Sequence, residues 1–149
     1  LTNVTFLRTQ IHKIDSYFCQ NEVEVIWITF PDPQLRISKA NKRLGHPRYL
    51  NLYYKFLVPG GDIHLKTDSP ELYNFTKNVI ELYDLNLISD IDNVYERIAS
   101  PELTIKTHYE KLDIAKSNKV FYLRFSLPGK IIDADDRLEV ILKTAINEQ

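Results

Sequence analysis

The sequence has no methionine, one cysteine and few glycines, and these shortages exclude several kinds of protein. The single Cys19 excludes an internal disulfide, and within a helical stretch we expect it to be a small buried apolar residue. No apolar run approaches the roughly 20 residues that span a bilayer. The four histidines are scattered and lack the spacing of a structural zinc site. We therefore expect a protein of the reducing cytoplasm with no membrane segment and no metal.

The start of the chain has neither a methionine nor a polar leader. It opens directly on a strand-like run over residues 3–7. A natural chain rarely begins in this way. We expect the natural protein to contain residues before Leu1.

The composition is that of one soluble globular domain. The chain has 149 residues, of which 44% are apolar and 26% charged, and this is enough to bury a core. The net charge of −1 hides an uneven distribution, because residues 34–61 contain no acid. The cations of this stretch are Arg36, Lys39, Lys42, Arg43, Arg48 and Lys55. Such a local concentration favours a polyanionic partner, although a solvated helix face is the alternative.

Strand-like and helix-like patterns alternate along the chain. Strands are predicted over residues 4–8, 23–30, 63–67, 85–91 and 119–127, and helices over residues 10–20, 47–57, 70–83 and 135–146. The run over residues 23–30 is nearly all apolar, which is typical of a central parallel strand covered on both faces. The alternation predicts an α/β fold with βαβ units and a doubly wound sheet.

An acidic residue follows each of two predicted strands. Asp32 comes after the strand that ends at Phe30, and Asp68 comes after Thr67. Ligands of open α/β sheets bind outside the carboxyl ends of the strands, so neighbouring strands would bring both carboxylates into one crevice. Taken singly, Asp32 can simply form a turn and Asp68 can simply precede a helix. Together with the basic stretch that follows Asp32, the pair favours a site.

Five short motifs occur in one order and spacing. They are residues 28–33 (ITFPDP), Lys42-Arg43-Leu44, Pro59-Gly60-Gly61, residues 65–68 (LKTD) and residues 107–110 (THYE). From residue 3 to 127 the chain resembles the bacterial tRNA (guanine-N7-)-methyltransferases, which modify guanosine 46 of tRNA. The resemblance implies a Rossmann-like class I methyltransferase sheet that binds S-adenosylmethionine.

The resemblance also implies that the chain is a part of that fold. The family's glycine-rich cofactor loop and first strands have no counterpart here, so residues 1–149 would be the C-terminal, substrate-side part of one methyltransferase domain. Residues 129–149 would form a helical extension. We expect the N-terminal strands of the sheet, and most of the cofactor site, to precede Leu1. We expect these residues alone to be inactive and to expose a sheet edge that aggregates or pairs with a second copy.

The family's site residues carry over by position. Asp32 matches the catalytic aspartate beside the cofactor, Arg36 matches a substrate-contacting lysine, and Asp68 matches a second substrate-binding aspartate. Gln10 stands where the family has a carboxylate near the cofactor's adenine, and Gln34 replaces a tryptophan. The remaining substrate contacts implied are Thr107, His108, Tyr109 and Glu110, although Thr-x-x-Glu is also an ordinary capping box. The expected tRNA phosphate contacts are Lys39, Lys42, Arg43 and Arg48.

The chemistry of this reaction agrees with these residue types. Guanine N7 carries a free lone pair, so its methylation needs no general base. A carboxylate can orient the guanine and stabilise the positive charge that develops on it. Two other hypotheses stay open: a degenerate relative that binds RNA without catalysis, and a different Rossmann-like enzyme acting on a small nucleotide. A glycine-rich loop before Leu1 would argue against the first, and the acid-free basic stretch argues against the second.

Overall fold

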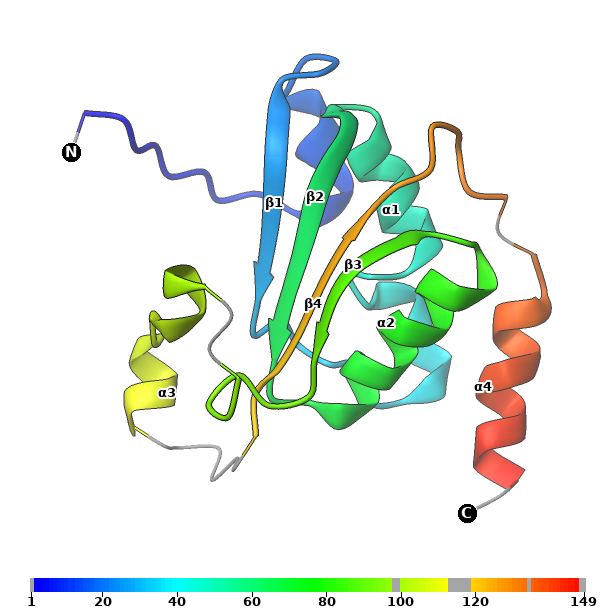
Figure 1. The fold of residues 1–149 in the computed structure, drawn as a ribbon. Helices are drawn as coiled ribbons and strands as arrows, with labels where there is room; N and C mark the ends of the chain where they lie inside the picture. The colour runs from blue at the N-terminus through cyan, green and yellow to red at the C-terminus, as the bar shows by residue number, and fades with distance from the viewer. Residues whose placement is uncertain (1, 98–99, 113–118, 134, 148–149) are drawn as a thin grey trace.

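The computed structural model describes residues 2–97, 100–112, 119–133 and 135–147, and it is built on a sheet of four strands (Figure 1). In chain order the strands are β1 (Val23–Thr29), β2 (Leu57–Thr67), β3 (Asn86–Ile91) and β4 (Phe121–Ser126). Their order across the sheet is β1-β2-β4-β3.

Two successive βαβ units generate this order. Helix α1 (Pro47–Tyr54) connects β1 to the parallel strand β2, and α2 (Pro70–Leu82) connects β2 to β3. The second crossover leaves a space one strand wide, which β4 fills antiparallel to both neighbours. The predicted α/β class is confirmed, and the sheet is consistent with a Rossmann-like methyltransferase fold.

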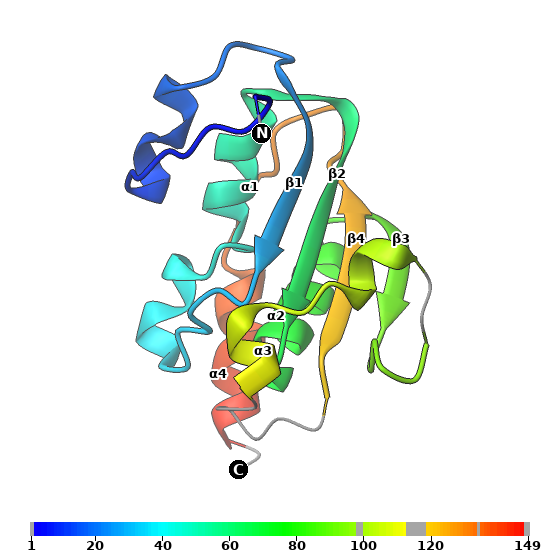
Figure 2. The same ribbon diagram turned by 90° about the vertical axis from the view of Figure 1, so that its left-hand side faces the viewer.

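The main core lies between the sheet and three helices on one face. Helices α1, α2 and α4 (Arg137–Asn147) lie on that side, and the short η3 (Pro101–Thr104) and α3 (His108–Leu112) lie on the other (Figures 1 and 2). Helix α2 shows how the sequence sets this packing. Ser69 caps it by accepting a hydrogen bond from the Leu72 amide at 3.1 Å, and Pro70 occupies its first turn. Its buried residues are Leu72, Tyr73, Phe75, Thr76, Val79 and Ile80.

Strand β1 differs from the expected central strand. It lies at an edge of the described sheet, and only Ile28 among its residues is buried. Trp27 keeps 40% of its surface exposed and stacks on His64 of β2, with ring centroids 4.1 Å apart. An apolar groove of about 490 Å³ runs beside β1 and is lined by residues such as Ile11, Val23 and Pro31. The predicted strand is present, and its position at an edge of the described sheet agrees with the expectation that residues 1–149 taken alone expose a sheet edge.

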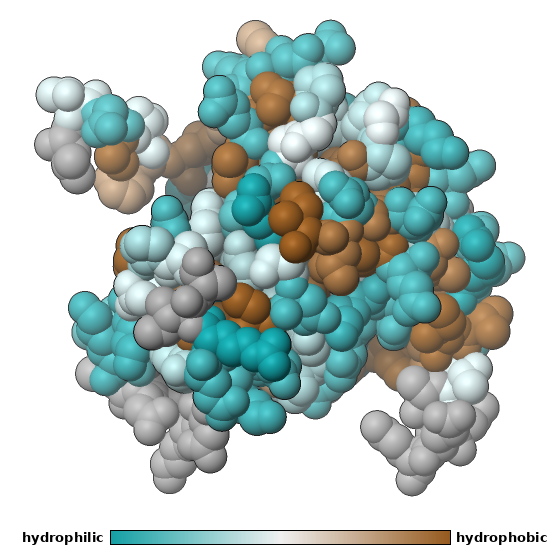
Figure 3. Space-filling view, in the orientation of Figure 1, coloured by the Kyte–Doolittle hydropathy of each residue, from teal (hydrophilic) through white to brown (hydrophobic). Residues whose placement is uncertain are grey.

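The N-terminal segment also departs from the prediction. Residues 4–8 form no strand, because backbone groups make a strand only by pairing and no described strand lies beside them (Figure 1). The expected helix over residues 10–20 is reduced to a 3₁₀ turn, η1 (Ile11–Ser16). Cys19 is exposed rather than buried. Phe6 is 95% exposed, and apolar patches are visible on this arm, over the sheet and near α4 (Figure 3).

The C-terminal extension is attached at two places. The Asn51 side chain of α1 accepts a hydrogen bond from the Ile132 amide at 2.7 Å and donates one to the Ile132 carbonyl at 2.9 Å. Leu138 of α4 is buried in the main core. The predicted last helix is therefore present, and it packs against α2. None of the described helices has the length and apolar character needed to cross a membrane.

Strand β2 begins earlier than the predicted strand over residues 63–67, because it includes Pro59-Gly60-Gly61 as a bulge. The register jumps there: Val23 pairs with Leu57, whereas Val25 pairs with Asp62. The predicted helix over residues 47–57 accordingly ends at Tyr54. A Cβ atom on Gly61 would lie 2.8 Å from the Glu24 carbonyl oxygen, so the two strands approach too closely there for any other residue.

We expect Gly61→Ala to lower the free energy of unfolding by about 1–3 kcal/mol, because the backbone must move to admit the methyl group. Urea unfolding of the natural full-length protein measures this. Gly129→Ala is the matched control, because nothing lies within 4 Å of the position that a Cβ atom would occupy there. Equal stability of the two variants would contradict the assigned role of the bulge.

Candidate substrate site at the carboxyl ends of β1 and β2

The two acidic residues singled out in the sequence follow strands that are direct neighbours. Thr29 is opposite Lys66 in the parallel pair, and the Phe30 amide donates to the Lys66 carbonyl at 2.8 Å. Asp32 and Asp68 therefore leave the sheet from adjacent strand ends. This confirms the expected strand pairing, and it puts both carboxylates at the edge where ligands of such sheets bind.

The turn after β1 holds Asp32 at the surface. Its Oδ1 accepts a hydrogen bond from the Gln34 amide at 3.0 Å. This is an Asx turn, so Asp32 does have the turn-forming role that the sequence allowed as its simpler interpretation. Phe30 and Gln34 have φ angles of 48° and 49°, a region that costs a non-glycine residue about 1 kcal/mol or more. The turn is therefore a strained conformation that other contacts must stabilise.

Arg43 supplies that stabilisation from inside the fold. Its Nε donates to the Pro33 carbonyl at 3.1 Å and to the Gln34 carbonyl at 3.2 Å, and its Nη2 donates to the same Gln34 oxygen at 3.1 Å. The guanidinium stacks on Phe75 of α2, and only 4% of the residue is exposed. Burial lowers the pKa of Arg43. The expectation of a phosphate contact is corrected for this residue, because it is buried and its Nε and Nη2 donate to the turn.

The other cations of the basic stretch face solvent. Arg36, Lys39 and Lys42 lie on or beside the 3₁₀ helix η2 (Ile37–Lys42), and Arg48 is in the first turn of α1. All are exposed, and none forms an ion pair with any described residue. Lys55 differs, because it pairs with Asp15 at 2.9 Å.

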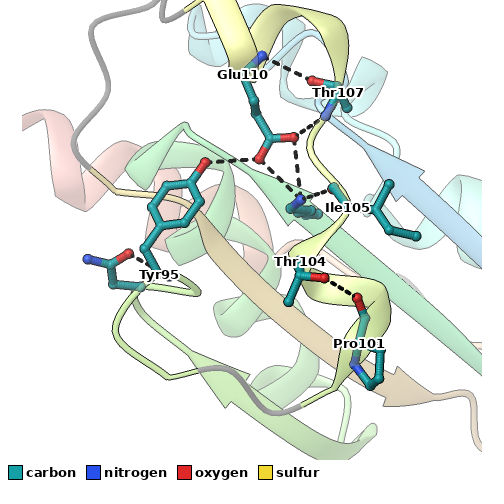
Figure 4. A network of polar contacts seen from close by, with 8 residues as sticks. Tyr95, Pro101, Thr104, Ile105, Thr107 and Glu110 are labelled. Atoms are coloured by element: carbon teal, nitrogen blue, oxygen red, sulfur yellow. Dashed lines mark hydrogen bonds and ion pairs between the residues drawn. The ribbon is translucent and has the colours of Figure 1, made fainter.

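The Thr-x-x-Glu segment forms both hydrogen bonds of a capping box (Figure 4). The Thr107 amide donates to Glu110 Oε2 at 2.6 Å, and the Glu110 amide donates to Thr107 Oγ1 at 3.2 Å. The Tyr95 hydroxyl donates to Glu110 Oε1 at 3.0 Å. The Glu110 carboxylate is thus directed inward, toward the sheet.

Lys66 of β2 completes this network and was not singled out from the sequence. Its Nζ lies 3.1 Å from Glu110 Oε1 and donates to the Ile105 carbonyl at 2.9 Å. The two charged side chains are 4% and 5% exposed. Burial raises the pKa of Glu110, but the Thr107 amide and Lys66 outweigh it and hold that pKa below its ordinary value. Glu110 is therefore a buried carboxylate with a buried counter-ion.

A pocket of about 290 Å³ lies between this segment and the strand ends. It is lined by Trp27, Thr29, Lys66, Glu102, Ile105 and Thr107. Asp68 follows Lys66 by two residues and Asp32 follows Thr29 by three, so their Cα atoms lie within about 8 and 11 Å of those lining residues. The structure thus brings Asp32, Asp68 and the Thr-x-x-Glu segment to one end of the sheet.

The remaining predicted residues contribute less to this arrangement. His108 is exposed at the start of α3, and the side chain of Tyr109 lies outside the described part of the structure. Gln10 is exposed at the N-cap of η1 and makes no side-chain capping bond. Among the described residues no group of three His, Cys, Asp or Glu side chains could hold a metal ion.

The apolar groove beside β1 does not fit S-adenosylmethionine. The groove beside β1 is lined almost entirely by apolar side chains, which do not match the charged groups and hydroxyls of that molecule. Gly60 and Gly61 belong to β2, and none of the four glycines begins a loop after β1.

The sheet is consistent with a Rossmann-like methyltransferase fold, and comparison with known proteins specifies the class. A model of the family described as "Putative methyltransferase" matches residues 1–123. The chain therefore belongs to this methyltransferase family, and the sequence-based resemblance is confirmed.

Curated relatives carry a more specific name. The chain is 44% identical to the tRNA (guanine-N(7)-)-methyltransferase of Porphyromonas gingivalis over 85% of its own length and 52% of the relative. It is 39% identical to the enzyme of the same name from Bacteroides fragilis, over 94% of this chain and 56% of the relative. The protein of that name from Christiangramia forsetii is 36% identical over 85% and 58%. The chain thus spans about half the length of these relatives.

We expect Arg43→Met to lower the free energy of unfolding by about 2 kcal/mol or more, because the charged donors of the Asp32 turn are lost. Arg48→Met is the control, since Arg48 is exposed and only stacks on the Tyr49 ring, a contact worth about 0.5–1 kcal/mol. Urea unfolding of the natural full-length protein gives both values. An Arg43 variant as stable as the control would show that the turn does not need the guanidinium.

Proposed function

We propose that the protein containing this chain transfers a methyl group to N7 of guanine in tRNA, at guanosine 46, and that the chain forms the substrate side of its active site. The observation that carries the proposal is the convergence of Asp32 and Asp68 at adjacent ends of β1 and β2, next to the pocket walled by the Thr-x-x-Glu segment. The names of the relatives support the same reaction.

The two carboxylates can perform the chemical roles that this reaction requires. Each can accept hydrogen bonds from the guanine N1–H and N2–H₂ groups, which turns N7 toward the methyl donor. The purine becomes positively charged as the methyl group arrives, and a nearby carboxylate stabilises that charge. We assign Asp32 the catalytic role and Asp68 and Arg36 the substrate contacts. Thr107 Oγ1 and the pocket wall of Ile105 would complete the enclosure.

S-adenosylmethionine is the proposed methyl donor, as implied by the family. Asp32 would face it from the substrate side, and Gln10 would reach its adenine. The groove beside β1 is apolar and does not match the charged groups of this molecule, so the described residues are assigned only the orientation of guanine and the balancing of its charge.

The exposed cations supply the contact with the rest of the tRNA. Arg36, Lys39, Lys42 and Arg48 lie in a stretch that begins four residues after Asp32. Because none of them forms an ion pair with a described residue, their charges are free to act on phosphates. This arrangement supports a polyanion-binding surface beside the acidic site.

We expect Asp32→Asn to reduce kcat for tRNA methylation by about 100-fold or more, because the amide cannot balance the positive charge on the purine. Its size is unchanged, so tRNA binding should persist. Glu81→Gln on the exposed face of α2 is the control and should retain full activity. Wild-type protein that binds tRNA and transfers no methyl group would instead support the non-catalytic RNA-binding alternative.

We expect Lys39→Ala with Lys42→Ala to weaken tRNA binding and to flatten its dependence on salt by about 0.7–0.9 in log–log slope for each lost phosphate contact. Lys13→Ala with Lys130→Ala changes the net charge equally at two other exposed positions. Titrations at several salt concentrations compare the two pairs. An unchanged slope in the first pair would place the tRNA on another surface.

A further inference from the structure

The buried ammonium of Lys66 is unusual for its place in the fold. Lysine is almost never fully buried unless it is paired, and here it lies at the end of β2, two residues before Asp68. Its partners belong to a segment about 40 residues further along the chain: the Ile105 carbonyl and the Glu110 carboxylate. Its ammonium also lies 5.6 Å from the ring centroid of Phe30, at the end of β1. One side chain thus contacts both strand ends and the segment that covers them.

We infer that Lys66 is a positioning residue, which holds residues 105–110 over the ends of β1 and β2 and so sets the pocket wall beside Asp32 and Asp68. The catalytic consequence of this inference rests on the proposed function, whereas its structural consequence does not. The bonds to Lys66 and Tyr95 that anchor the segment also fix the orientation of the Glu110 carboxylate.

The contacts explain why a charged pair holds the segment in place better than an apolar pair would. The Ile105 carbonyl and the Glu110 carboxylate approach Lys66 from two points of the segment, so the segment is held in both position and rotation. Thr107 lies between these points, and its amide also donates to Glu110. An apolar side chain at position 66 would fill the space, but it would leave a buried carboxylate without its counter-ion.

The first experiment measures the segment itself. In Lys66→Met of the natural full-length protein we expect hydrogen exchange of the Thr107 amide to quicken at least tenfold, while the amides of α2 keep their protection. Lys77→Met is the matched control, because Lys77 pairs with Asp90 at 2.8 Å on the half-exposed surface of α2. This measurement needs no catalytic activity, so it tests the inference even if the proposed reaction is wrong.

The second experiment measures catalysis. Lys66→Met should lower kcat for tRNA methylation on the order of 100-fold through misplacement of the pocket wall, with less than a threefold change in KM for tRNA. Glu110→Gln should lower kcat as well. The kcat of the double variant should be no lower than that of the more impaired single variant, because both substitutions break the same Lys66–Glu110 contact. Fully multiplicative losses would overturn the shared role. Wild-type protein without activity would refute the proposed function alone.

Tyr95→Phe keeps the test decisive if Lys66→Met does not fold. It removes one hydrogen bond to Glu110 from a residue that is 41% exposed, so the fold should survive. We expect Thr107 exchange to quicken a few-fold and kcat to fall by a similar factor. The inference is overturned if the variants that fold exchange Thr107 at the wild-type rate and methylate at the wild-type kcat.

Discussion

The parallel pairing of β1 with β2 is the constraint on which the rest of the site depends. It runs to the carboxyl ends of both strands, where the Phe30 amide binds the Lys66 carbonyl. The segments that follow β1 and β2 must therefore begin side by side at this edge of the sheet. The Asp32 turn, Asp68 and the cap of α2 at Ser69 all start from this edge, and the pocket lies against it.

The site uses cations in two physically different ways. Arg43 and Lys66 are buried and donate hydrogen bonds to carbonyl or carboxylate oxygens, and they hold the two loops that flank the strand ends. Lys39 and Lys42 are exposed and form no ion pair with a described residue. Desolvation explains the division, because a buried charge must be matched by fixed oxygens, whereas a surface charge stays hydrated until a polyanion approaches.

Much of the fold could be predicted from local patterns. The strand at β3 and the helices α2 and α4 have clear periodicity or caps, and the structure contains them close to the predicted bounds. The failures have physical causes. Residues 4–8 have strand-like side chains but no described partner strand, and the bulge at Gly61 depends on the approach of Glu24 from β1. Pairing and close approach are properties of two segments, and a local pattern describes only one.

The sequence by itself determined the class of the protein and the candidate residues. The motifs around Asp32, Asp68 and Thr107 pointed to a methyltransferase, and the family comparison confirms that class. Only the tertiary structure decided which charged residues act inside the fold. Arg43 and Lys42 are adjacent in the chain, yet one is buried against Phe75 and the other is exposed. Such differences arise from contacts between distant segments, as when Lys66 meets Glu110, and no local spacing encodes them.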